Sequence, residues 1–256
     1  MIRVSSLASG SKGNSLLIDG PEGALAVDAG LSARELVRRM EIVGVDPGRL
    51  RAILVTHDHS DHLRGVRVLA KRLGIPVYAT RDTLAAAHLP PGIREIPITP
   101  GIPFDAAGFS VVPFPLPHDA ADPVGYVVQG YGIRMGVATD LGSVNALVRE
   151  RLTGCDMLLL EFNYEERMLL DGPYPWFLKQ RIQGRLGHLS NDHSARFLSE
   201  LIHTDLQHVI LGHLSEVNNC PDRALAAAET VAGYGNGTRL TVGRQAEPTP
   251  IIVLEP

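Results

Sequence analysis

The sequence has 256 residues, of which 45% are hydrophobic and 20% charged, a composition typical of a globular chain. Its length suits one large domain, and we expect a single α/β domain over residues 1–256. The 24 Lys and Arg against 28 Asp and Glu give a formal net charge of −4, which excludes a globally basic surface. Any contact with nucleic acid therefore has to be local.

The cysteines and the N-terminus indicate the compartment. Cys155 and Cys220 lie far apart without a CxxC spacing, which favours buried thiols in a reducing compartment over a disulfide framework. The N-terminus lacks the long apolar stretch of a signal peptide, and no apolar run is long enough to cross a bilayer. We expect a cytoplasmic protein without a membrane segment.

The chain begins with two predicted strands, residues 2–7 and 15–18, joined by a loop rich in Gly and Ser. Small residues let such a loop turn tightly, and its free N–H groups, with Lys12, suit an anion. A plain hairpin turn explains the same loop, and this stretch alone favours the turn. A third strand, 25–27, ends at Asp28 and precedes a helix over 32–43. We assign Asp28 to hydrogen bonds that hold a metal-binding loop, not to the metal itself.

The strongest signal follows an apolar strand at residues 53–55. Directly after Thr56 come the ionisable side chains of His57, Asp58, His59, Asp61 and His62. A solvated loop does not normally hold three histidines, because imidazole is only partly charged at neutral pH.

The spacing of these residues indicates two metal ions. Residues two apart on an extended chain point the same way, so His57 and His59 converge on one ion. Asp61 and His62 fall in the first turn of the next helix and address a second ion. Imidazole with carboxylate suits zinc, manganese or iron, and no cysteine lies near enough to make the site rich in thiolate.

The following elements alternate between strand and helix before hairpins begin. We predict a helix at 66–73, a strand at 75–79 and a short helix at 81–88. Residues 93–116 carry frequent Pro and Gly and read as short antiparallel strands. Further predicted strands are 124–128, 133–138, 157–162, 209–211, 240–242 and 251–254, and further helices are 144–152, one ending near 202, and 222–232.

Three more polar residues follow predicted strands. His118, Asp140 and His213 each stand just beyond an apolar run. Ligand sites in α/β sheets lie outside strand ends, so these residues are expected to join the histidine cluster. A single carboxylate can reach two cations, which makes Asp140 the candidate bridge, and His213 completes the ligand set.

Residues 173–191 contain no Asp or Glu, while basic and aromatic side chains alternate there: Tyr174, Trp176, Phe177, Lys179, Arg181, Arg185 and His188. One interpretation is contact with a polyanion, with the rings stacking on bases. The other is an amphipathic helix that packs its aromatic rings inward. The residues alone leave both open. A helix capped by Ser190 or Asn191 follows, and His188 beside its N-terminus is well placed for a phosphate.

In order and separation, Asp28, THDHSDH, His118, Asp140 and His213 resemble the metallo-β-lactamase fold hydrolases. The resemblance covers nearly the whole chain and implies a four-layer αβ/βα sandwich of two mixed sheets flanked by helices. More specific stretches are similar to the WalJ/YycJ branch of DNA exonucleases: SGSKGNS, THDHSDHLRGV, PHDAADPVGY, ATDLG, GPYPWFLKQRIQGRLGHLSN and LGHLSEVNN.

This resemblance implies roles for individual residues. His57, His59 and His118 would hold one divalent ion, zinc or manganese, and Asp61, His62 and His213 a second, with Asp140 bridging them. A hydroxide between the ions would attack phosphorus, oriented by Asp61, while His188, Ser9, Ser11 and Asn14 hold the phosphate. One departure stands out: Asn163-Tyr164-Glu165 occupies the place where the branch is expected to carry Asn-His-Asp.

The implied function is a metal-dependent phosphodiesterase that acts on DNA, specifically a 5′-to-3′ exonuclease on double strands. The first alternative is a hydrolase of small molecules such as thioesters, lactams or cyclic phosphodiesters, which the acidic net charge slightly favours. The second is a catalytically silent binding module, against which the intact ligand set argues. The basic aromatic segment favours nucleic acid, and the sequence leaves the oligomeric state open.

Overall fold

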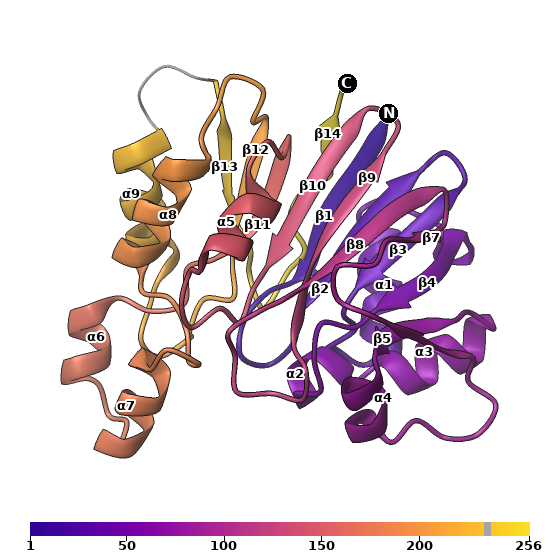
Figure 1. Ribbon diagram of the computed structural model, residues 1–256, viewed down its shortest axis with the longest axis horizontal. Helices are drawn as coiled ribbons and strands as arrows, with labels where there is room; N and C mark the ends of the chain where they lie inside the picture. The colour runs from indigo at the N-terminus through magenta and orange to yellow at the C-terminus, as the bar shows by residue number, and fades with distance from the viewer. Residues whose placement is uncertain (233–236) are drawn as a thin grey trace.

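The computed structural model describes residues 1–232 and 237–256, whose strands form two seven-stranded mixed sheets (Figure 1). The first sheet has the order β14 (Ile252–Leu254), β1 (Ile2–Ala8), β2 (Ser15–Gly20), β3 (Gly23–Val27), β4 (Leu50–Leu54), β5 (Val77–Thr80) and β6 (Glu95–Ile98). The second has the order β13 (Arg239–Val242), β12 (His208–Gly212), β11 (Met157–Glu161), β10 (Ile133–Ala138), β9 (Val124–Gly130), β8 (Phe109–Pro115) and β7 (Phe104–Ala106).

Helices cover the outer face of each sheet. The first sheet is covered by α1 (Ala33–Ile42), α3 (Val66–Leu73) and α4 (Arg81–Ala87), whose apolar side chains join one buried cluster with its strands. The second is covered by α5 (Ala146–Leu152), α8 (Asn191–Leu201) and α9 (Pro221–Ala232) through another cluster. Shorter elements are the 3₁₀ turn Pro47–Arg49, α2 (Ser60–Leu63), α6 (Glu166–Asp171) and α7 (Trp176–Gln183). The predicted four-layer sandwich is confirmed.

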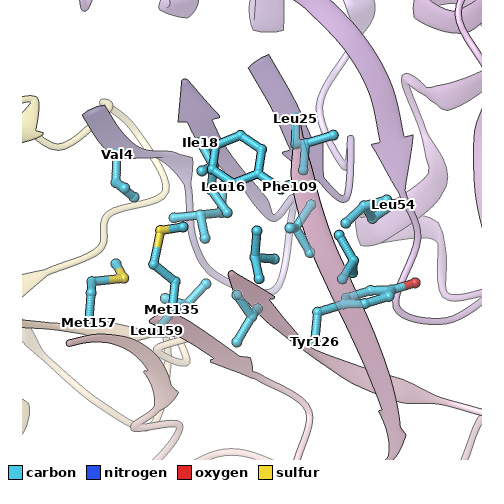
Figure 2. Close-up of a cluster of buried hydrophobic side chains, with 14 of the residues drawn as sticks. Val4, Leu16, Ile18, Leu25, Leu54, Phe109, Tyr126, Met135, Met157 and Leu159 are labelled. Atoms are coloured by element: carbon cyan, nitrogen blue, oxygen red, sulfur yellow. The ribbon is translucent and has the colours of Figure 1, made fainter. Parts of the chain in front are cut away.

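An apolar cluster lies between the two sheets, where side chains from both interdigitate (Figure 2). Alternation along the strands explains the layering: Leu16 and Ile18 of β2 face this central core, whereas Leu17 faces the helices. Met157 and Leu159 of β11 also point inward, while Leu158 and Leu160 contact the helical layer. Because both faces are covered, the strands read as continuous apolar runs instead of alternating ones.

Most predicted elements are confirmed to within a few residues, and the differences are local. The strand expected at 53–55 is β4, Leu50–Leu54. The helical stretch after the histidines is divided at Gly65 into α2 and α3. Gly65 packs so closely on the loop between β3 and α1 that an added Cβ would lie 2.2 Å from the carbonyl oxygen of Leu31. No helix in the described part of the chain is long and apolar enough to cross a membrane.

The sheet topology gathers several strand ends at one edge. β3 to β6 run parallel in the first sheet, as do β10 to β13 in the second. β8 has the same direction as β10, because each pairs antiparallel with β9. The sheets are tied at this edge by the Val124 amide, which donates to the carbonyl of Thr56 at 2.9 Å. Loops from both sheets therefore meet there.

Candidate metal centre

Three residues at this edge turn back sharply after their strands. Asp28 after β3, Asp140 after β10 and His213 after β12 have positive φ angles of 62°, 59° and 56°. This region costs a residue with a Cβ about 1–2 kcal/mol, and such strain concentrates at functional sites. The turns let each side chain remain over the strand ends, beside the loop that follows β4.

His57, His59 and His118 form the first group of ligand atoms. One nitrogen of each lies within 4.8 Å of the other two. The ring centroids of His57 and His59 are 4.6 Å apart, and each is 5.1 Å from that of His118. The predicted convergence of these three side chains is therefore present, with His118 supplied by the loop after β8.

Asp61, His62 and His213 form a second group with the same mutual limit of 4.8 Å. An oxygen of Asp61, Oδ2, lies 3.4 Å from Nε2 of His62 and 3.6 Å from Nε2 of His213. Asp61 and His62 come from α2, as the sequence predicted, while His213 enters from the end of β12.

Asp140 lies between the two groups. Its Oδ2 is 3.2 Å from Nε2 of His62, and its Oδ1 is 3.7 Å from Nε2 of His118. The same carboxylate belongs to two further candidate ligand groups, one with His57 and His62 and one with Glu161, His188 and His213. Since it reaches members of both sets, its position is that expected of a bridging ligand.

The polar atoms that face this centre fit a bound cation. Among the described residues, Nε2 of His57, Oδ2 of Asp140 and Nε2 of His213 are buried without a hydrogen-bond partner. Each such buried group costs about 1–3 kcal/mol when unsatisfied. Nitrogen and carboxylate ligands without thiolate suit divalent ions such as Zn²⁺ or Mn²⁺. The residues present therefore fit divalent metal.

The two carboxylates and His57 have the charge states that metal binding requires, whereas His62 and His213 have to release protons to bind metal. Burial would raise the pKa of the Asp140 carboxyl, but His213 and His62 outweigh it and hold the pKa well below its usual range. Burial likewise opposes ionisation of Asp61, and the imidazoles of His213 and His62 again lower its pKa. Burial lowers the pKa of His57, which keeps its ring neutral. Ionised carboxylates and a neutral imidazole are the forms that bind metal.

The imidazoles of His62 and His213 are shifted toward their protonated forms. Burial lowers the pKa of both rings, but Asp28 and Asp140 outweigh it and raise the pKa of His62 well above its usual value. Asp140, Asp61 and Glu161 raise the pKa of His213 to about 10. Metal binding therefore has to release protons from both rings.

Asp28 holds the histidine loop by hydrogen bonds. Its Oδ1 accepts from the Thr56 amide at 2.8 Å, and its Oδ2 accepts from the Thr56 hydroxyl at 2.8 Å. The same Oδ2 lies 2.7 Å from Nδ1 of His62, which leaves Nε2 of that ring facing the centre. Carboxylate–histidine pairs of this kind fix the orientation of metal-binding rings.

Glu161 is a buried residue that the sequence analysis did not assign. Its Oε1 lies 2.8 Å from Nδ1 of His188 and 2.9 Å from Nδ1 of His213, and its Oε2 accepts from the Leu141 and Leu189 amides. Burial would raise the pKa of Glu161, but His188 and His213 outweigh it and lower it to about 2. The sequence held one signal for Glu161: it is the last residue of an apolar strand, and Asp140 likewise follows the end of an apolar strand by two residues.

The loop between β1 and β2 hydrogen-bonds to residues of the centre. The Ser9 hydroxyl accepts from the His213 amide at 2.6 Å, and the Asn14 side chain donates to Asp61 Oδ2 at 3.1 Å. The side-chain oxygen Oδ1 of Asn14 accepts from the Gly10 amide at 2.9 Å. Ser9 and Asn14 are thus buried and engaged with protein groups, whereas Ser11 faces the open cleft. The structure brings only Ser11 and His188 of the predicted phosphate contacts to the cleft surface.

The cleft above the two groups has a volume of about 240 Å³. Its floor includes His59, Asp61 and Asp140, and its far wall is formed by the α7 segment. Arg181 of α7 donates from Nε to Asp119 at 2.5 Å, and Asp119 lies 3.5 Å from Nε2 of His118. This ion pair ties the wall to the metal-facing loop.

The exposure of the α7 aromatic residues excludes one of their two interpretations. Trp176 and Phe177 are 62% and 72% exposed, so the interpretation that packs these rings inward is wrong. Lys179 is the one buried cation of residues 173–191, and its ammonium donates to the carbonyl of Leu170 at 2.6 Å and holds α7 against α6.

The residues that replace the expected Asn-His-Asp have structural partners. The Asn163 side chain donates to the carbonyl oxygen of His213 at 2.7 Å. Tyr164 is 4% exposed and pairs with Ser190 in an isolated β-bridge. Glu165 caps α6 by accepting from the Met168 amide at 2.7 Å. The triplet thus supports the His213 turn and begins α6.

Fold and site together define a metal-dependent hydrolase of the β-lactamase superfamily. A family model described as "Beta-lactamase superfamily domain" matches residues 24–213, and the chain belongs to this family. This range holds all seven predicted metal ligands: His57, His59, Asp61, His62, His118, Asp140 and His213.

The chain is similar to two named bacterial nucleases. It is 34% identical over 246 residues to exodeoxyribonuclease YycJ of Bacillus anthracis, covering 92% of each chain. It is 33% identical over 228 residues to exodeoxyribonuclease WalJ of Streptococcus pneumoniae, covering 87% of this chain and 85% of that one. The metallo-β-lactamase fold protein YhfI of Bacillus subtilis shares the fold, with a TM-score of 0.73, 16% identity and coverage of 97% and 98%.

Proposed function

We propose that this hydrolase cleaves phosphodiester bonds of DNA, as a 5′-to-3′ exonuclease on double strands that uses two divalent ions. The observation that carries the proposal is the position of Asp140 on the cleft surface, with one oxygen 3.2 Å from Nε2 of His62 in the second ligand group and the other 3.7 Å from Nε2 of His118 in the first. The similarity to proteins named exodeoxyribonucleases over about nine-tenths of the chain supports DNA as substrate.

In this proposal the ligands divide as the family resemblance implies. His57, His59 and His118 would hold one ion, Asp61, His62 and His213 would hold the other, and Asp140 would be shared by both. Two divalent ions, when bound, activate a water molecule for attack on phosphorus and stabilise the charged oxygens of the transition state.

The remaining steps belong to side chains of the chain itself. Asp61 orients the attacking water, since it lies on the cleft floor beside His62 and His213. His188 is 20% exposed and faces the cleft, where it hydrogen-bonds a phosphate oxygen of the substrate. Glu161 holds that ring through Nδ1, so that Nε2 is directed at the substrate. Ser11 is a second phosphate contact on the cleft surface.

The first test is degradation of duplex DNA labelled at either end by the purified protein. It is run with and without chelator, with Mn²⁺ or Zn²⁺ restored, and with Asp140→Ala and His59→Ala in parallel. His193→Ala is a matched control, because this histidine is exposed on α8. We expect stepwise shortening from the 5′ end that chelator and both centre variants abolish and the control variant retains.

A small-molecule hydrolase is the second candidate, because the chain has a net charge of −4 and a cleft of only about 240 Å³. Intact DNA together with metal-dependent hydrolysis of a thioester or a small phosphodiester would support it and reject the nuclease. Shortening from the 3′ end would reject the polarity alone.

A further inference from the structure

The beginning of α7 presents two large aromatic side chains to solvent. Trp176 and Phe177 are 62% and 72% exposed, and together they form what we call the aromatic ledge. Large aromatic residues normally bury most of their surface, and an exposed pair indicates a binding surface. Neither ring contributes to the cores between the sheets or beneath the helices.

The ledge is continuous with the cleft. Leu178, Arg181 and Ile182 of the same helix line the cleft wall, and Arg181 follows Phe177 by four residues, so these two side chains lie on the same face of α7. α7 has eight residues and is therefore about 12 Å long, which matches about three nucleotides of a stacked strand at about 3.4 Å each. A strand with one phosphate at the metal centre thus has its neighbouring nucleotides within reach of the ledge.

The charge around the ledge favours an anion. No Asp or Glu occurs from residue 173 to 191, although the whole chain is acidic. Arg185 is exposed and has no ion-pair partner among the described residues, whereas Arg181 is paired with Asp119. A segment that exposes both flat rings and a guanidinium without an ion-pair partner suits a ligand that combines planar faces with negative charge, as a nucleic-acid strand does.

We propose that Trp176 and Phe177 stack on unpaired bases of the DNA strand whose phosphodiester enters the cleft. This inference rests on the proposed function and deepens it, because it specifies an unpaired stretch at the end under attack. In a closed duplex the faces of internal bases are already stacked on their neighbours, so two adjacent rings gain little there. The ledge therefore favours a separated strand, and Arg185 binds the phosphates of that strand.

The chain provides its own reporter, because Trp176 is its single tryptophan. Metal-loaded protein is titrated with a cleavage-resistant phosphorothioate DNA single strand, and tryptophan emission is recorded. An abasic strand of equal length and charge tests the bases, and a blunt duplex tests the need for unpaired ones. We expect quenching by the single strand, and binding of the abasic strand that is at least about tenfold weaker.

Variants test the ledge independently of fluorescence. Trp176→Ala and Phe177→Ala are compared with Ile102→Ala, which removes an apolar side chain that is 61% exposed and outside the cleft lining. We expect each ledge variant to lower kcat/KM on DNA about tenfold relative to hydrolysis of bis(p-nitrophenyl) phosphate, which has no bases to stack. The ratio for Ile102→Ala should equal that of the unaltered protein.

Each result that contradicts these expectations rejects a different part of the proposal. Equal binding of abasic and natural strands, or equal quenching by blunt duplex, overturns stacking on unpaired bases while DNA cleavage stands. A dimer that dissociates in the Trp176→Ala variant assigns the ledge to a second copy of the chain. Failure of the unaltered protein to cleave any DNA rejects the proposed function, and the inference with it.

Discussion

The carboxylate of Glu161 lies 2.8 Å from Nδ1 of His188, a ring that faces the cleft. The same oxygen lies 2.9 Å from Nδ1 of His213 in the second ligand group. One fully buried acid therefore orients both a predicted metal ligand and a predicted substrate contact. Hydrogen bonds from two backbone amides to its other oxygen fix its position. The roles of the two histidines can be separated by mutating them and the acid in turn.

His188→Ala should lower the turnover of DNA by at least about 100-fold while leaving bound metal unchanged. The reason is that His188 is in neither ligand group of the proposed metal pair, although it shares a candidate group with Asp140, Glu161 and His213. It faces the cleft beside Asp140, with Nδ1 3.9 Å from Oδ1. Metal content by elemental analysis and single-turnover cleavage are measured on the same preparation. Loss of metal in this variant would refute the assignment, and His193→Ala is again the control.

Glu161→Gln should reduce both metal affinity and stability. The new amide NH₂ has to face at least one of the N–H donors around Glu161, which leaves buried groups unsatisfied at a cost of about 1–3 kcal/mol. Loss of the carboxylate behind His213 should weaken metal binding by about 10–100-fold. Chelator competition and thermal unfolding measure the two effects. Glu150→Gln, on the exposed face of α5, should change neither, and wild-type affinity in Glu161→Gln would exclude this orienting role.

The convergence of the histidine cluster was predictable because its information is local. His57, His59, Asp61 and His62 occur within six positions at the end of a strand, so spacing alone indicated how they converge. Asp140 and His213 were predictable because each follows an apolar run. Their convergence with the cluster depends on both sheets sharing one edge, which the family resemblance supplied and periodicity did not.

Other features were not predictable, because they depend on partners distant in sequence. Ser9 resembles a phosphate contact in a Gly/Ser loop, but its hydroxyl accepts from the amide of His213, 204 positions away. The outward direction of Trp176 and Phe177 depends on how α6 and α7 lie on the sandwich (Figure 1). Their composition fitted both an inward and an outward face.

The two cysteines should differ strongly in reactivity. Burial raises the pKa of the Cys155 thiol to about 11, whereas Cys220 is half-buried. Thiolate is the reactive form, so a raised pKa leaves little of it at pH 8. In the folded protein we expect an aromatic disulfide reagent to label Cys220 first, and Cys155 to react faster only as the pH rises toward 11. Denatured protein, in which both should react quickly, is the control, and equal rates in the native state would contradict the burial of Cys155.

Gly30→Ala should disrupt the centre although Gly30 contacts no metal. An added Cβ would lie 1.6 Å from the carbonyl oxygen of Asp61 and 2.5 Å from the Asn14 amide nitrogen, so the two loops that carry these residues would have to separate. We expect a loss of at least about 3 kcal/mol in the free energy of unfolding, measured with urea, together with weaker metal binding.

Gly154→Ala is the matched control for this substitution. Gly154 has a φ of +72° and nothing within 4 Å of an added Cβ, so only backbone strain of about 1–2 kcal/mol applies. Metal affinity should be unchanged there, because the turn between α5 and β11 carries no residue of the centre. If both substitutions cost the same and neither alters metal binding, then close packing between the loops of Asn14 and Asp61 does not hold the ligands in place.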